Sequence, residues 1–268
     1  MRSPYQAIGF EAEEFDDLAP SLAELESAAT NRRIGFGRAY GQWSDPSGAE
    51  IWLRKGRFGR IEGAAPHFAG PGEMRVRLAK RIEPAEGGEL DGGFYGWANP
   101  KTDGDDSGDY PLVFDAPDLQ LHRDLVLPTP ATVQLAAFPY EIESFESEEA
   151  FYASQDRTDL AFAARSFIPA GLFGADGDVI DPPEALCVMT GIIIDSDVKM
   201  NALTQRRFHW ALVDTLGGVI DVVCAPVDLP GPPRPGAVVH GTFRLSGRIA
   251  TGGKERARRK KKTDDPED

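Results

Sequence analysis

The chain has 268 residues, of which 29 are Lys or Arg and 43 are Asp or Glu, and its hydrophobic fraction is 41%. This length allows one large domain or two small ones, and the hydrophobic fraction is high enough for a packed core, which excludes a chain that is disordered throughout. The 2 Cys residues form no C-x-x-C pair, so a disulfide-rich scaffold and a thiolate zinc site are excluded as well.

The first residues, Met1 to Gln6, lack the apolar core of a signal peptide. The longest apolar stretch, residues 186–194, is far shorter than the roughly 20 residues that a membrane-spanning helix needs. We therefore expect a cytoplasmic protein without a membrane partner.

The net charge of −14 is spread unevenly along the chain. Residues 1–183 carry 16 basic and 32 acidic side chains, and residues 184–253 carry 6 of each. An acidic body repels nucleic acid and anionic membranes at long range. The last segment, residues 251–268, is predicted to be a disordered charged tail because it has almost nothing to bury. Its basic residues, which include Arg258, Arg259 and Lys260, could act as a nucleic-acid arm or fold back on the acidic body.

Residues 1–82 are predicted to form an α+β part. A strand is expected over Tyr5–Glu11, followed by an amphipathic helix, because apolar residues recur every three or four positions from Phe15 to Ala29. A turn is expected at residues 45–48, which read Asp-Pro-Ser-Gly. Alternating apolar and polar residues then predict strands at Ala49–Arg54, Arg60–Ala64 and Glu73–Ile82.

This order of strand, helix and hairpin strands over residues 5–68 resembles one βαβββ half of the vicinal-oxygen-chelate (glyoxalase-like) families. The resemblance implies metal ligands on the first and fourth strands, where this chain offers Gln6 or Glu11 and then Glu62, with His67 nearby. It supplies the alternative function, that of a glyoxalase-like metal-dependent enzyme.

Residues 83–183 are expected to be a loop-rich segment. Strands are predicted at 110–114 and 131–142, and a helix-like stretch follows at Ser147–Gln155. The strand and acidic helix over 131–155 echo residues 5–29, which leaves an internal duplication as an alternative to two unrelated parts.

Residues 184–250 show the clearest β pattern. The pair Gly217-Gly218 predicts a hairpin between two alternating stretches. Gly191 and Gly241 fall at positions where a strand must bulge or bend. The layout resembles the OB-fold, a small five-stranded barrel, and implies that an upstream strand such as 131–142 supplies the fifth strand. The alternative is a plain curled antiparallel sheet.

The predicted fold class is therefore α+β and strand-rich, with an N-terminal βαβββ-like part and a C-terminal antiparallel curled sheet or OB-like barrel. OB-folds bind single-stranded nucleic acid through aromatic side chains that stack on bases and basic side chains that contact phosphates. The candidate binding residues are Arg207, Phe208, Trp210, Phe243 and Arg244, together with the tail residues named above. Because Phe208 and Trp210 share one strand face, the alternative is that the aromatic side chains belong to the core.

The sequence contains no serine-hydrolase elbow, phosphate-binding loop or H-E-x-x-H motif. The stretch His122-Arg123-Asp124 is more typical of a surface histidine than of a general base. Cys187 and Cys224 are expected to be buried apolar residues. We predict no catalytic residue, no metal site and no cofactor.

One acidic stretch, residues 103–108, matches the first half of an EF-hand calcium loop. The glutamate required at the twelfth position is replaced by Phe114, so an acidic loop is the preferred interpretation. The function expected from the sequence is that of a non-catalytic binding or interaction protein. Its partner is a protein or a single-stranded nucleic acid, and a further hypothesis is that the acidic surface receives a basic partner.

Overall fold

The fold is taken from a computed structural model, which describes residues 3–83, 90–101, 107–155, 161–172 and 180–250. The basic tail residues Arg258, Arg259 and Lys260 lie outside the described residues, and so does most of the calcium-like stretch. No helix in the described part of the chain is long and apolar enough to cross a membrane. The fold belongs to the α+β class and is rich in strands, as the sequence predicts.

The N-terminal segment differs from the prediction. Residues expected as a strand form a 3-10 turn, η1 (Gln6–Ile8), because Gly9 adopts a φ of +86° and reverses the chain. Its apolar side chains do not alternate between a buried and an exposed face, as a strand would require. The predicted helix is present but divided into the 3-10 helix η2 (Phe15–Ser21) and α1 (Leu22–Ala28). Pro20 lies at the division, where its missing N–H and its ring disfavour a continuous α-helix.

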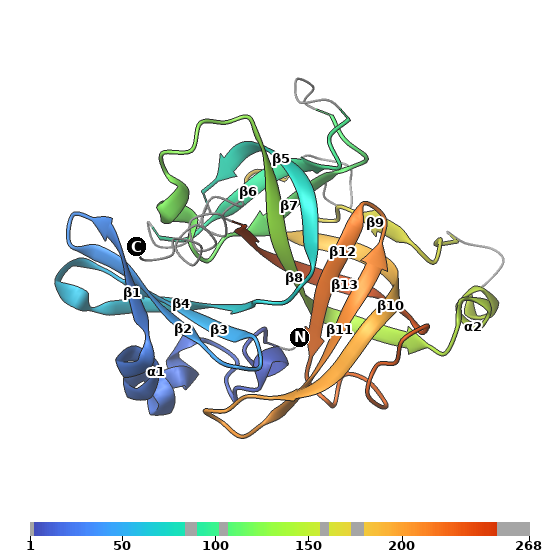
Figure 1. The fold of residues 1–268 in the computed structure, drawn as a ribbon, viewed down its shortest axis with the longest axis horizontal. Helices are drawn as coiled ribbons and strands as arrows, with labels where there is room; N and C mark the ends of the chain where they lie inside the picture. Colours follow the sequence, from blue (N-terminus) through green and yellow to red (C-terminus); the bar gives the residue numbers. More distant parts are fainter. Residues whose placement is uncertain (1–2, 84–89, 102–106, 156–160, 173–179, 251–268) are drawn as a thin grey trace, which may run out of the picture.

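Four antiparallel strands follow in sequence order and form a sheet of their own: β1 (Thr30–Gly35), β2 (Arg38–Ser44), β3 (Ala49–Lys55) and β4 (Ile61–Phe68). The predicted turn at residues 45–48 joins β2 to β3, and the Asp45 side chain accepts a hydrogen bond from the Ser47 backbone at 2.9 Å. A short 3-10 turn, η3 (Arg57–Gly59), joins β3 to β4. This sheet and the N-terminal helices form one side of the molecule (Figure 1).

The remaining strands form one mixed sheet of nine strands in the described part of the chain. Its strands are β5 (Glu73–Ile82), β6 (Gly93–Ala98), β7 (Pro111–Asp115), β8 (Thr129–Phe145), β9 (Ser166–Ile168), β10 (Leu186–Met200), β11 (Arg207–Thr215), β12 (Gly218–Cys224) and β13 (Val238–Ile249). Two short helices, η4 (Leu119–His122) and α2 (Glu148–Ser154), flank β8. The predicted hairpin around Gly217-Gly218 is confirmed as the β11–β12 pair.

The sheet curls until its strands close a ring. Strands β10, β11 and β12 pair in turn, β12 runs parallel to β8, β8 pairs with β13, and β13 returns to β10. The strand predicted at 131–142 therefore does pair with the C-terminal strands. It completes the ring from a position upstream in the sequence.

A second ring shares β8 and β13 with the first. It runs through β5, β6 and β7, and it closes where β7 lies parallel to β13 at Asp115 and Ser246. Each ring consists of three consecutive antiparallel strands, the next strand in the chain, and one strand shared from the other ring. The first ring has β10 to β13 and β8, and the second has β5 to β8 and β13. The predicted echo of residues 5–29 in 131–155 is wrong, because residues 5–29 contain no strand. The repetition in this fold lies between β5–β8 and β10–β13.

Two glycines mark close approaches between strands of the ring. A Cβ at Gly241 would lie 2.1 Å from the Glu141 carbonyl oxygen, and a Cβ at Gly191 would lie 2.3 Å from Val213. The register of β13 shifts at residues 242–243, directly after Gly241, and that of β10 shifts at 193–195. The irregularities thus lie close to the predicted bends.

The four-stranded sheet is attached to the outer face of the first ring by aromatic side chains. Phe68 of β4 contacts Phe208 edge-on, with ring centroids 6.1 Å apart, and lies 6.4 Å from Trp210. Ile8 and Leu25 of the N-terminal segment are fully buried in the same cluster. A separate cluster fills the inside of the rings and includes Phe94, Phe114 and Phe243.

Candidate functional site

A cleft of about 910 Å³ opens between the four-stranded sheet and the nine-stranded sheet. Side chains of β8 and β13, namely Phe138, Tyr140, Arg244 and Ser246, form its floor. Residues 64–66 of β4 line it from the other sheet, and the N-terminal segment contributes further residues. Its volume lies at the upper end of the range found for ligand-binding pockets.

Two arginines in the cleft already have carboxylate partners. Arg54 of β3 forms an ion pair with Asp91, and the Arg244 Nε donates to the Asp115 Oδ2 at 2.5 Å. The charge of Asp115 raises the pKa of Arg244, while burial lowers the pKa of Arg54. Because both guanidinium groups are paired, they present little uncompensated positive charge to a ligand.

Three more carboxylates, those of Glu13, Glu14 and Asp17, line the cleft from the start of η2. The Asp17 Oδ2 accepts hydrogen bonds from the backbone N–H groups of Glu13 at 2.9 Å and Glu14 at 3.1 Å, and these bonds lower the pKa of Asp17. The turn therefore holds three negative charges together at the edge of the cleft. With Asp91 and Asp115, the described lining has five carboxylates against two guanidinium groups, a formal charge of −3.

Tyr5 ties the N-terminal wall to β4. Its hydroxyl donates to the Ala64 carbonyl oxygen at 2.8 Å, and burial raises the pKa of Tyr5 to about 12. The phenol is therefore neutral near neutral pH. The wall that carries the acidic residues is held in place by a buried hydrogen bond rather than by loop contacts alone.

A chain of buried polar side chains runs behind the floor of the cleft. Nδ1 of His67 lies 2.8 Å from the Ser246 Oγ, and its Nε2 lies 2.7 Å from the Gln134 Oε1. The Gln134 Nε2 donates to the Phe68 carbonyl oxygen and to the Asp221 Oδ2, both at 3.0 Å. These bonds connect β4, β8, β12 and β13, and so they join the two sheets.

The network determines which nitrogen of His67 carries the proton. The amide nitrogen of Gln134 faces two acceptors, so its oxygen must face His67, and the His67 Nε2 must donate to it. Nδ1 is then free to accept from the Ser246 hydroxyl. Burial lowers the pKa of His67 to about 4, so the imidazole is neutral near neutral pH and ties the sheets together without a charge.

Asp221 anchors the other end of this chain. Its carboxylate is fully buried and accepts hydrogen bonds from the Trp210 Nε1 at 2.8 Å and the Gly72 backbone N–H at 2.8 Å, besides the one from Gln134. Burial raises the pKa of Asp221, and these donors oppose that shift. A charge this deeply buried is tolerated only when it is well supplied with donors.

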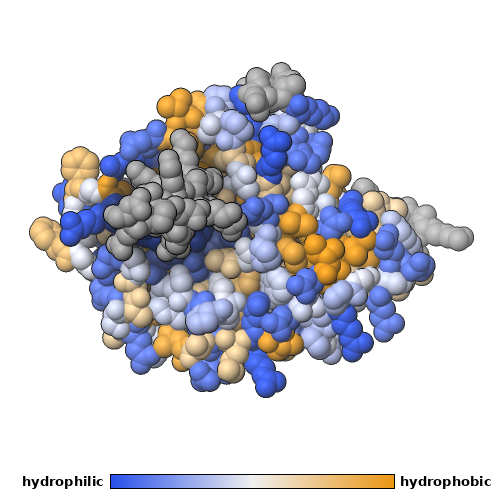
Figure 2. Space-filling model, in the orientation of Figure 1, coloured by the Kyte–Doolittle hydropathy of each residue, from blue (hydrophilic) through white to orange (hydrophobic). Residues whose placement is uncertain are grey.

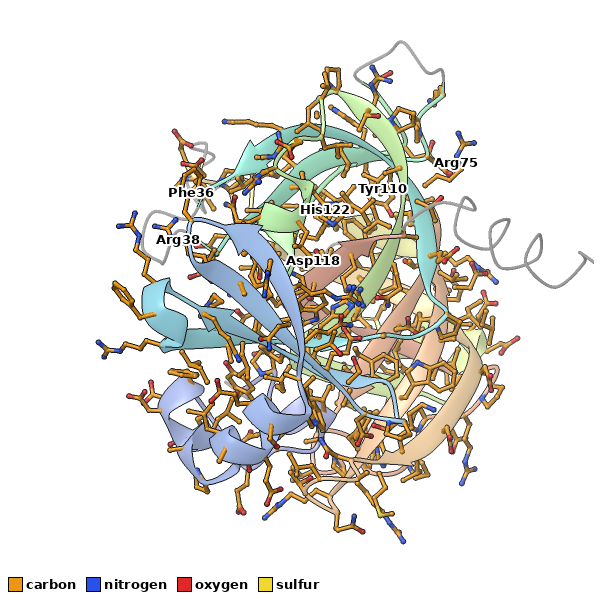
Figure 3. All side chains as sticks on the ribbon, turned by 60° about the vertical axis from the view of Figure 1, so that its left-hand side comes forward. Phe36, Arg38, Arg75, Tyr110, Asp118 and His122 are labelled. Atoms are coloured by element: carbon orange, nitrogen blue, oxygen red, sulfur yellow. The ribbon has the colours of Figure 1, made fainter. Side chains whose placement is uncertain are left out.

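A second charged cluster lies between the sheets, and Figure 3 labels two of its members, Asp118 and His122. Arg248 of β13 donates from Nη1 to both oxygens of Glu50, at 3.2 and 3.0 Å, and its Nε lies 3.6 Å from the Asp118 Oδ2. The His122 ring has the carboxylate of Asp118 as its partner, with Nε2 3.3 Å from Oδ2, rather than that of Asp124 beside it in the sequence. The cluster is an ion-pair network inside the junction of the sheets.

The residues predicted for nucleic-acid binding are not gathered on one surface. Phe208 and Phe243 are fully buried and Trp210 is 6% exposed, so all three contribute to the cores of this fold. Arg207 is exposed at the start of β11, and Arg244 lies in the cleft with Asp115. With their rings covered, the aromatic side chains offer no open face on which a base could stack.

The positions implied as metal ligands are also apart. Glu11 forms an ion pair with Arg206, Glu62 lies exposed on β4, and His67 belongs to the buried network. Within the described residues, no group of three or more His, Cys, Asp or Glu side chains could hold a metal ion. Cys187 and Cys224 are buried and unpaired, and burial raises the pKa of both thiols.

The sequence does not single out the residues of the cleft. Arg54 and Tyr140 belong to predicted strands, and nothing in a strand pattern says that they face the same space. The one usable signal is the acidic run at residues 11–17, which on its own indicates only the start of a helix. No protein-family model, curated protein or solved structure matches the chain.

Proposed function

We propose that the protein is a non-catalytic binding protein that receives a basic peptide segment of a partner protein in the cleft. The observation that carries the proposal is the lining of the cleft, in which five carboxylates face only two guanidinium groups. Lysine and arginine side chains complement such a lining.

The arrangement of the charges supports a peptide rather than a small ion. Glu13, Glu14 and Asp17 are at one edge, while Phe138 is buried and Tyr140 partly buried in the floor. A basic side chain has a long apolar stem and a charged end, so it can lay the stem against the partly buried Tyr140 and present the charge to the edge. Arg54 and Arg244 are held by their own carboxylates and keep the walls in place.

The nucleic-acid version of the function has less support at this site. The acidic lining repels phosphate, and the aromatic residues expected to stack on bases are buried. We infer nevertheless that the ring of β10, β11, β12, β8 and β13 is an OB-like barrel with its fifth strand taken from upstream. Its long first strand, its hairpin and its one parallel pair between β12 and β8 support that inference.

The glyoxalase-like alternative has no observation in its favour beyond the order of elements in the sequence. The first strand of that order is a 3-10 turn, and Gln6, Glu11 and Glu62 are not brought together within the described residues. We therefore keep binding as the proposed function.

The experiment is a titration with a fluorescent peptide of alternating lysine and arginine, followed by anisotropy at low and moderate salt. The double variant Glu13→Gln/Glu14→Gln removes two charges from the cleft. Glu14 is the N-cap residue of η2, and glutamine keeps a side-chain oxygen at that position, while Asp17 is unchanged. Since an exposed ion pair contributes roughly 0.2–1 kcal/mol, we expect Kd to rise by about 2- to 30-fold.

The matched control is Glu141→Gln/Glu146→Gln, which removes two exposed charges of β8 and its end that do not line the cleft. It should leave Kd nearly unchanged. An equal loss in both double variants would show that only the net charge matters, and the absence of saturable binding at low salt would contradict the proposal outright.

A further inference from the structure

Two hairpin ends of the four-stranded sheet carry the same three residues. Phe36-Gly37-Arg38 forms the turn between β1 and β2, and Phe58-Gly59-Arg60 lies in the turn between β3 and β4. The pairing of Ala39 with Lys55 places the two turns at the same end of the sheet. We call this end, defined by residues 36–38 and 57–60, the FGR end.

The two phenylalanine rings project into solvent. Phe36 is 88% exposed and Phe58 is fully exposed. Figure 3 shows Phe36 and Arg38 at the outer end of the β1–β2 hairpin, and Figure 2 shows pale orange apolar groups protruding beside blue ones at the same edge of the molecule. Neither ring contributes to the cores of the described structure.

The backbone at both positions is unfavourable for phenylalanine. Phe36 has a φ of 52° and Phe58 a φ of 66°, and each is followed by a glycine with a φ of 76°. Glycine and asparagine adopt this left-handed conformation readily, whereas a bulky side chain does not. Local stability would therefore favour Asn-Gly at both turns, so the rings are better explained by binding than by folding.

Basic side chains outnumber acidic ones around the FGR end. Residues 31–62 contain seven arginines and lysines and three acids, Asp45, Glu50 and Glu62. Glu62 is beside Gly56 at this end, and Arg54 and Lys55 are paired with Asp91 and Glu26. Asp45 lies in the turn at the other end of the sheet, and Glu50 is buried against Arg248. Arg57 and Arg60 are exposed at the two sides of the β3–β4 turn.

We propose that the FGR end binds single-stranded nucleic acid, with bases stacked on Phe36 and Phe58 and phosphates held by Arg57, Arg60 and neighbouring arginines. Exposed rings interleaved with guanidinium groups are the usual means of binding a single strand without sequence preference. An anionic membrane fits less well, because interfacial binding scales with the apolar area inserted and two rings supply little of it, whereas each ring alone can stack on a base. None of these residues lines the cleft, so the site goes beyond the proposed function.

The test is the binding of a fluorescent thymidine oligomer of roughly 20 nucleotides to the full chain at low salt. The variant Phe36→Asn/Phe58→Asn places a residue suited to the left-handed backbone at each turn, so its melting temperature should be unchanged or higher. Its Kd should rise by about 5- to 150-fold for each ring that stacks on a base.

Two further measurements complete the test. Arg57→Gln/Arg60→Gln should lower the slope of log K against log salt by about 1.4, as expected for two lost phosphate contacts on a single strand. Val126→Asn, which removes an apolar side chain that is 82% exposed elsewhere, should leave Kd unchanged.

Three results would overturn the proposal. One is the absence of saturable binding of the oligomer at low salt. Another is an unchanged Kd in the double phenylalanine variant when its melting temperature is unchanged or higher. The third is binding to vesicles of anionic phospholipid without binding to the oligomer, which would assign the FGR end to a membrane surface.

Discussion

Replacing His67 by glutamine should remove a distinct acid sensitivity of the fold. The His67 side chain is fully buried, and burial lowers its pKa to about 4 from the usual 6.5. A group whose pKa is lowered by folding contributes stability above its unfolded pKa and loses it as the pH falls toward the folded pKa. For His67 the loss therefore occurs between about pH 6.5 and pH 4.

The size of the effect follows from the two pKa values. Relative to neutral pH, protonation of His67 in the unfolded chain lowers the free energy of unfolding by about 2 kcal/mol at pH 5 and by about 3 kcal/mol at pH 4. The assay is urea unfolding, followed by tryptophan fluorescence, of the wild-type protein and His67→Gln at several pH values. Glutamine cannot reproduce both hydrogen bonds of the imidazole, so the variant is expected to be less stable near neutral pH. The quantity compared is therefore the slope of the free energy of unfolding against pH.

The wild-type protein should lose stability more steeply than the variant as the pH falls. Carboxylates and the other described histidines, such as His209 and His240, are present in both proteins, so their titration cancels in the difference. Parallel loss of stability over this pH range would refute the assignment of His67 as a buried neutral link between the sheets.

Two further predictions concern the framework. Gly241→Ala should lower the free energy of unfolding by about 1–3 kcal/mol, because the added Cβ would meet the neighbouring strand. The control Gly231→Ala, whose Cβ would have nothing within 4 Å, should change it little. Urea unfolding measures both variants, and equal stabilities would contradict the prediction. Asp221→Ala should lower the free energy of unfolding by about 2–4 kcal/mol, because it leaves buried donors unsatisfied. The control Asp124→Ala, at an exposed position, should change the melting temperature little. A mild effect of Asp221→Ala would mean that the network is dispensable.

The strands of this fold are largely predictable because their signal is local. Alternation along Glu73–Ile82 and the Gly217-Gly218 turn each depend on a few neighbouring residues, and both predictions are confirmed. The predicted N-terminal strand is wrong because residues 5–11 are apolar enough for a strand but are buried on several sides at once. Such burial depends on contacts with β4 and β11, which no local pattern contains.

The sequence predicts that the first ring needs a strand from elsewhere in the chain. The C-terminal unit lacks a fifth strand of its own, and the stretch at 131–142 is the available candidate. Its pairing, as β8, with β12 and β13 is confirmed. The second ring is not foreseeable from the sequence, because it depends on the pairing of β5 with β8 and on a parallel contact between β7 and β13 at Asp115 and Ser246. Contacts between strands so far apart in the sequence leave no periodic trace.

The candidate sites are harder to predict than the fold. The cleft combines residues from positions 3 to 246, and their proximity follows from the attachment of the four-stranded sheet through Phe68. The FGR end is present in the sequence as two Phe-Gly-Arg stretches, but the pairing register is needed to bring them to one end of the sheet. The attached sheet also covers the aromatic residues predicted to bind bases, because Phe208 and Trp210 face Phe68 of that sheet.

The most direct measurement of the proposed function is amide hydrogen exchange of the full chain with and without a saturating basic peptide. Slower exchange should be confined to the N-terminal wall around Glu13 and Asp17 and to the amides of Ala64 and Ala65 on the strand that faces it. Protection found only on strands away from the cleft, or no protection despite bound peptide, would contradict the binding site described above.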